Sequence, residues 1–288
     1  MSEQTEKPSI KIIVAVIAAI AVILAACITG SLGLIDNLIP LAVLSNESQA
    51  AESPSPSANL PNPTAQSLDR ILYVYFSDPA LAAEYQEMLV NGGFSVETTH
   101  MNQLPETDLS RIGLIIVGPD TIGSGEAEEW YNAWGDEQTV ASINNSGKPI
   151  IGLGNGGYGI FGRLNLRIGG GYGAGGFDTG NVNLRPYRSI LQEPNAIAEG
   201  EIDLYVEEVE TRDIFLGSDA EPLSPAADVV GLGVITATLD NGVTVEYGRV
   251  VLQQDRFLLW GFNASPNLLT EEGKAFFENI VRFSLTNL

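Results

Sequence analysis

The chain has 288 residues and carries 36 Asp and Glu against 14 Lys and Arg, which gives a formal net charge of −22 at pH 7. An acidic surface of this size repels nucleic acid and anionic lipid surfaces, so it argues against nucleic-acid binding and suits solubility, basic partners or divalent cations. The chain has one cysteine and one histidine. It therefore has no internal disulfide and no thiolate metal site, and a metal would need oxygen ligands or His100.

The first apolar segment, residues 10–30, is long enough to cross a bilayer as a helix. Lys7 and Lys11 stand at its start, and acidic residues such as Asp36 and Glu47 follow it. The positive-inside rule then predicts a cytoplasmic tail over residues 1–9 and an extracytoplasmic main domain. We expect a single-pass protein of the cell membrane, in contact with the lipid bilayer.

A lipid anchor is the alternative for the same segment. Residues 24–27 read Leu-Ala-Ala-Cys, which resembles a bacterial lipoprotein processing site with Cys27 as the lipidated residue. Residues 31–44 remain apolar, whereas a lipid tether usually runs directly into polar linker, so the uncleaved helix is favoured and lipidation stays open. This membrane-proximal segment is predicted to lie at the membrane surface or to pack on a partner helix.

Residues 45–67 are rich in Ser, Pro, Asn and Ala and predict a linker. Residues 68–288 are enough for one α/β domain with a substantial core. Its first half predicts strands and helices in the order strand, helix, strand, strand, helix, strand, over residues 71–76, 80–91, 94–100, 112–118, 125–144 and 149–152. The continuous apolar runs are typical of parallel strands, so we expect a flavodoxin-like parallel sheet with helices on both faces.

The second half predicts β-rich additions, with strands over residues 202–209, 213–216, 229–239, 243–252 and 257–262. A hairpin is expected around Asp240, Asn241 and Gly242. The chain then predicts a helix over residues 270–283, with Thr270 as its N-cap. The glycine tract 169–176 predicts a loop over the carboxyl edge of the sheet, with Tyr172 lining a binding crevice.

Residues 149–161 predict a short strand, a tight glycine turn and a helix, the layout that exposes a nucleophile above a sheet. The apex is Gly154, which has no side chain to attack a substrate, so the turn argues against covalent catalysis. The turn also fits Gly-x-Gly-x-x-Gly, but it follows the fourth strand and no strand ending in Asp or Glu comes after it, which weighs against dinucleotide binding. Two interpretations stay open: the glycines allow close approach to a neighbouring strand, or backbone amides at the helix start hold an anion or a small polar ligand.

Three segments carry a family resemblance, namely residues 114–119, residues 149–157, and residues 258–266 running into 269–274. Together they resemble the class I glutamine amidotransferase-like superfamily, closest to its divergent, often non-catalytic branches that include trehalose-utilisation-like proteins. In the catalytic members the elbow reads Gly-x-Cys-x-Gly, and a His and a Glu come late in the domain. Here Gly154 takes the cysteine position, and His100 precedes the elbow. The resemblance implies a domain without the catalytic triad, so we expect no catalytic residues, no cofactor and no metal.

A small polar ligand is expected near the elbow, held by Gly154, Asn155, Gly156, Gly157, Tyr158, Asp120 and Tyr172. Two further features are weaker. Asp178 and Asn183 bound a segment with oxygen ligands at calcium-like intervals, but it lacks a closing acidic residue. Trp130 and Trp134 share a face of the predicted helix, which indicates core packing more than a partner-binding patch.

These observations predict a membrane-anchored extracytoplasmic binding or accessory subunit of a membrane protein assembly, built on a catalytically inactive amidotransferase-like domain. The alternatives are a small-ligand sensor, an enzyme using carboxylates or a cofactor at the crevice near Gly154, and a structural protein of the cell envelope. An accessory subunit predicts membrane partners that purify with it. An enzyme predicts turnover that disappears when Asn155 or Asp120 is changed, and a structural protein predicts self-association.

Overall fold

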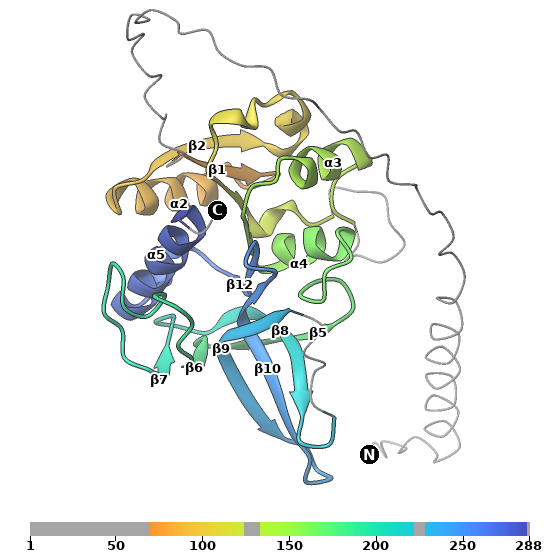
Figure 1. Cartoon of the computed structure of the whole chain (residues 1–288), viewed down its shortest axis with the longest axis vertical. Helices are drawn as coiled ribbons and strands as arrows, with labels where there is room; N and C mark the ends of the chain where they lie inside the picture. Colours follow the sequence, from red (N-terminus) through yellow and green to blue (C-terminus); the bar gives the residue numbers. More distant parts are fainter. Residues whose placement is uncertain (1–69, 124–132, 222–227, 287–288) are drawn as a thin grey trace, which may run out of the picture. The chain divides into compact units, whose positions relative to one another are not determined.

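Five parallel strands form the centre of the domain in the computed structural model, which describes residues 70–123, 133–221 and 228–286 (Figure 1). They are β1 (Arg70–Tyr75), β2 (Ser95–His100), β3 (Leu114–Val117), β4 (Ile150–Leu153) and β11 (Phe257–Trp260). Their order, β2-β1-β3-β4-β11, and their parallel pairing are those of a flavodoxin-like sheet. The predicted parallel sheet is confirmed.

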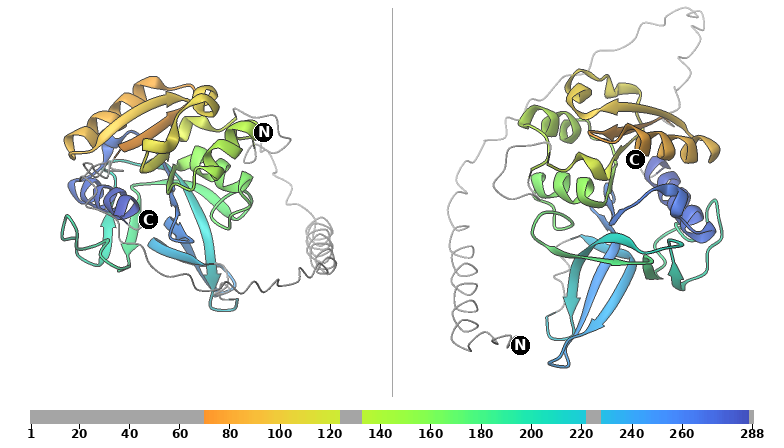
Figure 2. Two further views of the ribbon diagram at one scale, coloured as in Figure 1. Left: turned by 45° about the horizontal axis from the view of Figure 1, so that its top comes forward. Right: turned by 180° about the vertical axis from the view of Figure 1, so that it is seen from behind.

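Helices cover both faces of this sheet, as predicted (Figure 2). The helices α2 (Pro79–Asn91) and α5 (Glu271–Thr286) pack on one face, and α3 (Glu137–Asn145) and α4 (Gly154–Arg163) pack on the other. Thr270 caps α5 as expected, because its hydroxyl accepts a hydrogen bond from the Gly273 amide at 2.9 Å.

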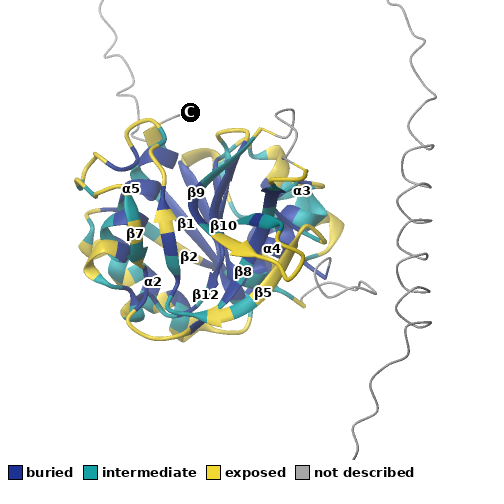
Figure 3. Cartoon of the chain, turned by 90° about the horizontal axis from the view of Figure 1, so that it is seen from below, coloured by how far each residue is buried: buried dark blue, intermediate teal, exposed yellow. Residues whose placement is uncertain are grey.

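The core forms two clusters, one on each side of the sheet, because strand residues contribute alternately to its two sides. On the α2 and α5 side, the Tyr73 ring stacks on Tyr85 at 5.4 Å between centroids, and Tyr85 meets Phe277 at 6.0 Å. On the other side, Val74 packs in the same cluster as Phe161 of α4. Figure 3 shows the inner strands of the sheet as buried, whereas the edge strand β2 is largely exposed.

The sheet continues past β11 into antiparallel strands, in the order β11-β10-β9-β6-β7, and β8 branches from β10 to pair with β5 and β12. The bounds are β5 (Gly173–Asp178), β6 (Asn181–Leu184), β7 (Gly200–Asp203), β8 (Val209–Ser218), β9 (Val229–Thr238), β10 (Thr244–Gln253) and β12 (Phe262–Asn263). Short 3-10 helices are η1 (Met101–Glu106), η2 (Leu109–Arg111), η3 (Pro119–Thr121) and η6 (Pro266–Leu268). The β9–β10 hairpin confirms the predicted turn, where Gly242 has a φ of +83°.

The glycine tract was predicted as a loop, and this is wrong for residues 173–176. They belong to β5, which pairs antiparallel with β8. A Cβ on Gly173 would lie 2.4 Å from the Asp213 carbonyl oxygen, so a residue without a side chain lets the two backbones meet. The predicted strand over residues 202–209 is also wrong in its middle. β7 ends at Asp203 and β8 begins at Val209, and in the segment that connects them the Leu204 and Tyr205 side chains are buried in the core.

The predicted helix over residues 125–144 is confirmed in its last part, where α3 lies, and is wrong for residues 133–136, which precede α3. Residues 124–132, with Trp130, lie outside the described residues, and Trp134 precedes α3 and does not belong to it. Gly135 adopts a φ of +54° and separates the two. The Trp134 side chain is fully buried, and its indole donates to the Thr121 hydroxyl at 2.8 Å, so Trp134 is a core residue.

Asp136 is the N-cap of α3, because its carboxylate accepts a hydrogen bond from the Thr139 amide at 2.7 Å, and that bond lowers the pKa of Asp136. Asp136→Ala is expected to lower the Tm by about 2–4 °C at pH 7. Because the pKa of Asp136 is lower in the folded state, this stabilisation is present above the unfolded-state pKa and is lost as the pH falls through the folded-state pKa. Thermal unfolding from pH 7 to pH 2 checks this. Asp136→Asn is the matched control, since it keeps the cap but should lose the pH dependence; equal stability of the alanine variant and the wild type would contradict the expectation.

The predicted transmembrane helix over residues 10–30, the segment 31–44 and the linker 45–67 lie outside the described residues. Among the helices that the structure does describe, none combines the length and the apolar character needed to cross a bilayer.

Candidate ligand-binding site

A cavity of about 510 Å³ lies at the carboxyl end of the parallel strands, where the chain order reverses between β1 and β3. This is the place where open α/β sheets usually bind ligands. We call it the crevice, and it is lined by residues from the start of α2, from η3, from the first turn of α4, and from β12 and the two residues after it. They are Asp78, Ala80, Leu81, Glu84, Pro119, Asp120, Asn155, Asn263, Ala264 and Ser265.

The elbow beside the crevice keeps the backbone geometry of a nucleophile turn without a nucleophile. Gly154 follows β4 directly, begins α4 and has a φ of +46°, a conformation that side-chain-bearing residues rarely adopt. A Cβ on Gly154 would lie 2.1 Å from the Asn263 Oδ1 and 2.8 Å from the Phe262 carbonyl oxygen. The Asn263 side chain therefore covers the apex, and its Oδ1 accepts a hydrogen bond from the Asn155 amide at 2.7 Å.

The other elbow glycines serve close packing. A Cβ on Gly157 would lie 2.3 Å from the Gly152 carbonyl carbon, and one on Gly156 would lie 2.0 Å from the Gly118 carbonyl oxygen. The first turn of α4 thus rests directly on the backbone of β4 and on the loop after β3. Of the two interpretations of this turn, close backbone approach describes Gly156 and Gly157. An anion bound at the start of α4 would accept a hydrogen bond from the Asn155 backbone amide. That amide already donates to the Asn263 Oδ1.

Asp120 joins two loops at the crevice. Its Oδ2 accepts hydrogen bonds from three successive backbone amides, those of Phe76 at 2.9 Å, Ser77 at 2.6 Å and Asp78 at 2.7 Å. The carboxylate therefore holds the loop between β1 and α2 against η3. Its other oxygen, Oδ1, is buried and has no hydrogen-bond partner among the described residues.

Two more polar atoms near Asp120 are buried without a partner in the described part of the chain, the Tyr73 hydroxyl and the Asn263 Nδ2. The Tyr73 hydroxyl and the Asp120 Oδ1 are neighbours, because both lie within 3.0 Å of the position that a Cβ on Gly118 would take. Burial, and then the Asp120, Asp78 and Glu84 carboxylates, raise the pKa of Tyr73 well above its usual value. The phenol therefore stays protonated and can donate. Buried polar groups without partners are costly, so these atoms mark a place where water or a ligand group can be accommodated.

The charge of the crevice is negative. Asp78, Glu84 and Asp120 line it, and none of its lining residues is basic. Arg212 of β8 approaches from outside: its Nε donates to the Asn155 Oδ1, and its guanidinium pairs with Glu210 at 2.6 Å. Arg212 therefore orients the Asn155 side chain, and the crevice favours groups that donate hydrogen bonds or carry positive charge.

Comparison with known proteins shows which solved structures the fold resembles. No family model and no curated protein sequence matches this chain. A solved structure of a putative ThuA-like protein from Bacteroides uniformis superposes with a TM-score of 0.52 at 11% identity, covering 80% of this chain and 96% of that chain. The fold of this chain is therefore similar to that of a putative ThuA-like protein.

Two amidotransferase-type structures resemble the domain more weakly. A putative GMP synthase protein from Thermoplasma acidophilum gives a TM-score of 0.41 at 10% identity, covering 74% of this chain and 93% of that chain. A glutamine amidotransferase from Thermotoga maritima gives 0.38 at 11% identity, covering 75% of this chain and 95% of that chain. At such identities the likeness concerns the fold and not the activity.

The structure brings only some of the predicted site residues together. Asp120 and Asn155 line the crevice, whereas Gly154, Gly156 and Gly157 form its support. Tyr158 is buried on the α4 side, where its hydroxyl accepts from the Gly171 amide at 2.9 Å. Tyr172 is 47% exposed and packs beneath the Arg167 guanidinium at 4.1 Å, outside the crevice.

The remaining candidates have structural contacts of their own. The His100 Nδ1 accepts from the Asn102 amide at 3.2 Å, and its ring packs against Tyr75 and Phe76. Asp178, considered for calcium, instead pairs with Arg249 of β10. The sequence reasoning missed Tyr73 and Asn263. Asn263 lies in the resemblance segment 258–266, in β12 shortly after the last parallel strand, and that position was the available signal.

Proposed function

We propose that this protein is a membrane-anchored extracytoplasmic binding subunit, built on an amidotransferase-like domain that has lost covalent chemistry. One observation carries the proposal: the Asn263 Oδ1 lies 2.1 Å from the place where any Cβ at the elbow apex would stand. A side chain has no room at Gly154, so a nucleophile at the elbow would require Asn263 to move.

Recognition at the crevice supports the binding role. Two polar atoms here have no hydrogen-bond partner among the described residues: the Asp120 Oδ1, which can accept a hydrogen bond, and the Asn263 Nδ2, which can donate one. Both side chains line the crevice, and its carboxylates add negative charge. A small polar ligand with an amine or amide donor and one acceptor fits this set.

A binding experiment on the full chain tests the role of the crevice. Small polar amides should raise its Tm, and Asp120→Asn and Asn263→Ala should remove the effect while the exposed Glu207→Gln, as a control for the charge change in Asp120→Asn, keeps it. The same mixtures analysed by mass spectrometry should contain unchanged ligand. Product that forms with the wild type and disappears in Asp120→Asn would contradict the binding role and favour an enzyme using carboxylates.

Membrane anchoring and a subunit role rest on the sequence of residues 1–67. Gentle detergent extraction from native membranes, followed by sizing and mass spectrometry of the intact chain, tests both. We expect a chain that retains Met1 and migrates with other membrane proteins. A chain that begins at a lipidated Cys27 and migrates alone would overturn the subunit role and leave a lipid-anchored small-ligand sensor as the alternative.

A further inference from the structure

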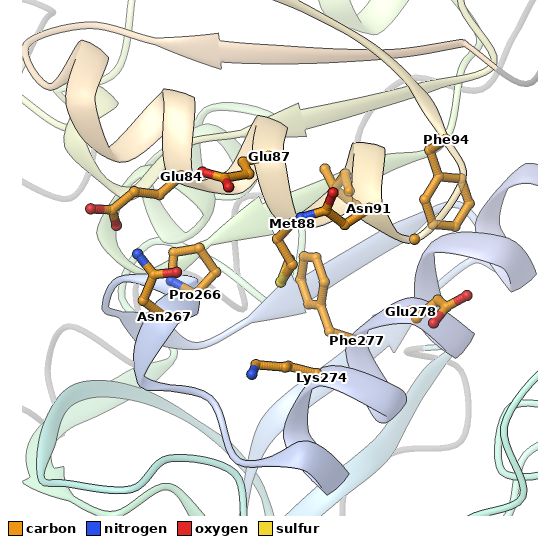
Figure 4. A pocket seen from close by; sticks show the side chains of 12 residues that line it. Glu84, Glu87, Met88, Asn91, Phe94, Pro266, Asn267, Lys274, Phe277 and Glu278 are labelled. Carbon is orange, nitrogen blue, oxygen red and sulfur yellow. The ribbon is translucent and has the colours of Figure 1, made fainter.

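A second cavity, of about 410 Å³, lies between α2 and α5, on the face of the sheet opposite α4 (Figure 4). Its volume falls in the range of small-molecule pockets, about 300–1,000 Å³. We call it the helix pocket. It is separate from the crevice except at Glu84, which lines both.

The floor of the helix pocket is apolar. Met88 of α2 and Phe277 of α5 face each other across it, and Phe94 closes one end (Figure 4). Phe277 is 1% exposed and Phe94 is 7% exposed, and both belong to the core of the domain, which fixes their positions. The floor therefore presents a rigid apolar surface at the bottom of a cavity.

Two of the charges on the rim are already compensated. The Lys274 ammonium pairs with Glu271 at 3.0 Å. The Glu278 carboxylate pairs with Arg282 at 3.2 Å, and the Arg282 guanidinium also stacks on the Phe94 ring at 4.5 Å. These pairs leave little net charge at the α5 side of the pocket.

The α2 side carries negative charge that the structure does not compensate. Glu84 and Glu87 stand one turn apart on α2 above the apolar floor (Figure 4). Glu84 accepts a hydrogen bond from the neutral Ser265 hydroxyl at 2.5 Å. Neither carboxylate forms a salt bridge with any residue in the described ranges. An apolar floor below two carboxylates of like charge complements a cation that has an apolar body.

We propose that the helix pocket is a second binding site, and that its ligand is a small primary ammonium ion with a short alkyl or aromatic body. The ammonium group lies against Glu84 and Glu87, and the apolar body lies on Met88 and Phe277. The acidic rim repels the carboxylate of the same shape, and a neutral alcohol of the same shape lacks the charge attraction. This site does not depend on the crevice, so the two proposals can fail separately.

The test uses n-butylammonium and the full chain in a non-ionic detergent, with 13C label in the methionine methyl groups. Met88 lies in the helix pocket, whereas Met101 is 1% exposed in the core cluster on the opposite face, so the Met101 methyl signal is an internal control. We expect n-butylammonium to shift the Met88 signal saturably and to leave the Met101 signal in place. Butyrate should have no effect, and 1-butanol should bind more weakly.

Variants test the charge contact. Glu87→Gln should weaken n-butylammonium binding about 2- to 5-fold, the effect of one partly exposed ion pair, and Glu84→Gln with Glu87→Gln about 5- to 10-fold. Glu207→Gln removes an exposed carboxylate elsewhere and should change nothing. Equal shifts with butyrate, parallel shifts of Met88 and Met101, or no saturable shift with the wild type would each overturn the proposal. The ligand series on the wild type decides the question even if a variant fails to fold.

Discussion

Gly156→Ala is expected to destabilise the domain by about 3 kcal/mol or more, above the usual cost of overpacking. The added Cβ would lie 2.0 Å from the Gly118 carbonyl oxygen and 2.3 Å from the Thr121 hydroxyl oxygen. The Gly118 carbonyl belongs to the backbone and cannot rotate away. The Thr121 hydroxyl is also held in place, because it donates to the Gly118 carbonyl oxygen at 2.8 Å and accepts a hydrogen bond from the Trp134 indole. Relief therefore requires α4 to move away from η3. Urea unfolding followed by circular dichroism measures the loss.

Gly176→Ala is the matched control for this expectation. A Cβ there would meet only the Thr211 hydroxyl at 3.5 Å, which is ordinary contact, so the change should stay within about 0.5 kcal/mol. A Gly156→Ala variant as stable as Gly176→Ala would contradict the close packing of the elbow.

Arg249→Met is expected to cost about 3 kcal/mol, at the lower end of the range for breaking a buried ion pair. The Arg249 side chain is 6% exposed, and its Nε donates to the Asp213 Oδ1 at 3.1 Å. Its Nη1 donates to the Asp178 Oδ1 and the Asn181 carbonyl oxygen, both at 2.8 Å. Without the guanidinium, the negatively charged Asp213 carboxylate would remain mostly buried and would lose the cation that pairs with it. Asp178 is 37% exposed and loses less, which is why we expect the lower end of the range.

The pH dependence of this variant gives a second readout. Burial raises the pKa of Asp213, and the Arg249 charge opposes that shift. In Arg249→Met the opposition is gone, so protonated Asp213 is favoured more strongly in the folded state. The destabilisation should therefore shrink as the pH falls through the raised folded-state pKa, which lies above the usual aspartate value of ~3.9.

Arg185→Met is the control, because Arg185 forms an exposed pair with Glu246 and its loss should cost at most about 1 kcal/mol. Unfolding in urea at several pH values compares the two variants. A pH-independent loss of about 1 kcal/mol or less in Arg249→Met would show that the ion pairs of Arg249 with Asp178 and Asp213 do not stabilise the fold.

The first half of the fold could be predicted because β1, β3 and β4 are buried on both faces. β3 and β4 consist of apolar runs bounded by turns, and this pattern reports parallel strands directly. The second half was harder, because some of its strands carry no such pattern. β5 reads Gly-Ala-Gly-Gly-Phe-Asp and is held by backbone hydrogen bonds to β8, so its composition indicated a loop.

The sequence located the elbow and part of the lining of the crevice, but not the buried polar groups beside them. The elbow and the crevice follow from the strand order, and Asp120 and Asn155 follow from their positions after β3 and β4. Tyr73 lies inside a buried strand, where a tyrosine in an apolar run is read as core, and its unpartnered hydroxyl depends on three-dimensional neighbours. Asn263 comes more than a hundred residues after Gly154 and covers it only in the folded chain.

The order of the parallel strands also constrains how the chain assembles during synthesis. β4 ends at Leu153, but its outer neighbour β11 begins at Phe257, about 100 residues later. At ~5–20 residues per second, the ribosome needs about 5 to 20 s to produce that interval. Throughout it the outer edge of β4 lacks the strand that pairs with it in the native sheet, while β1, β2 and β3 have already been made. The nascent domain is therefore most open to wrong strand pairing or chaperone capture at β4, and that exposure ends when β11 is inserted.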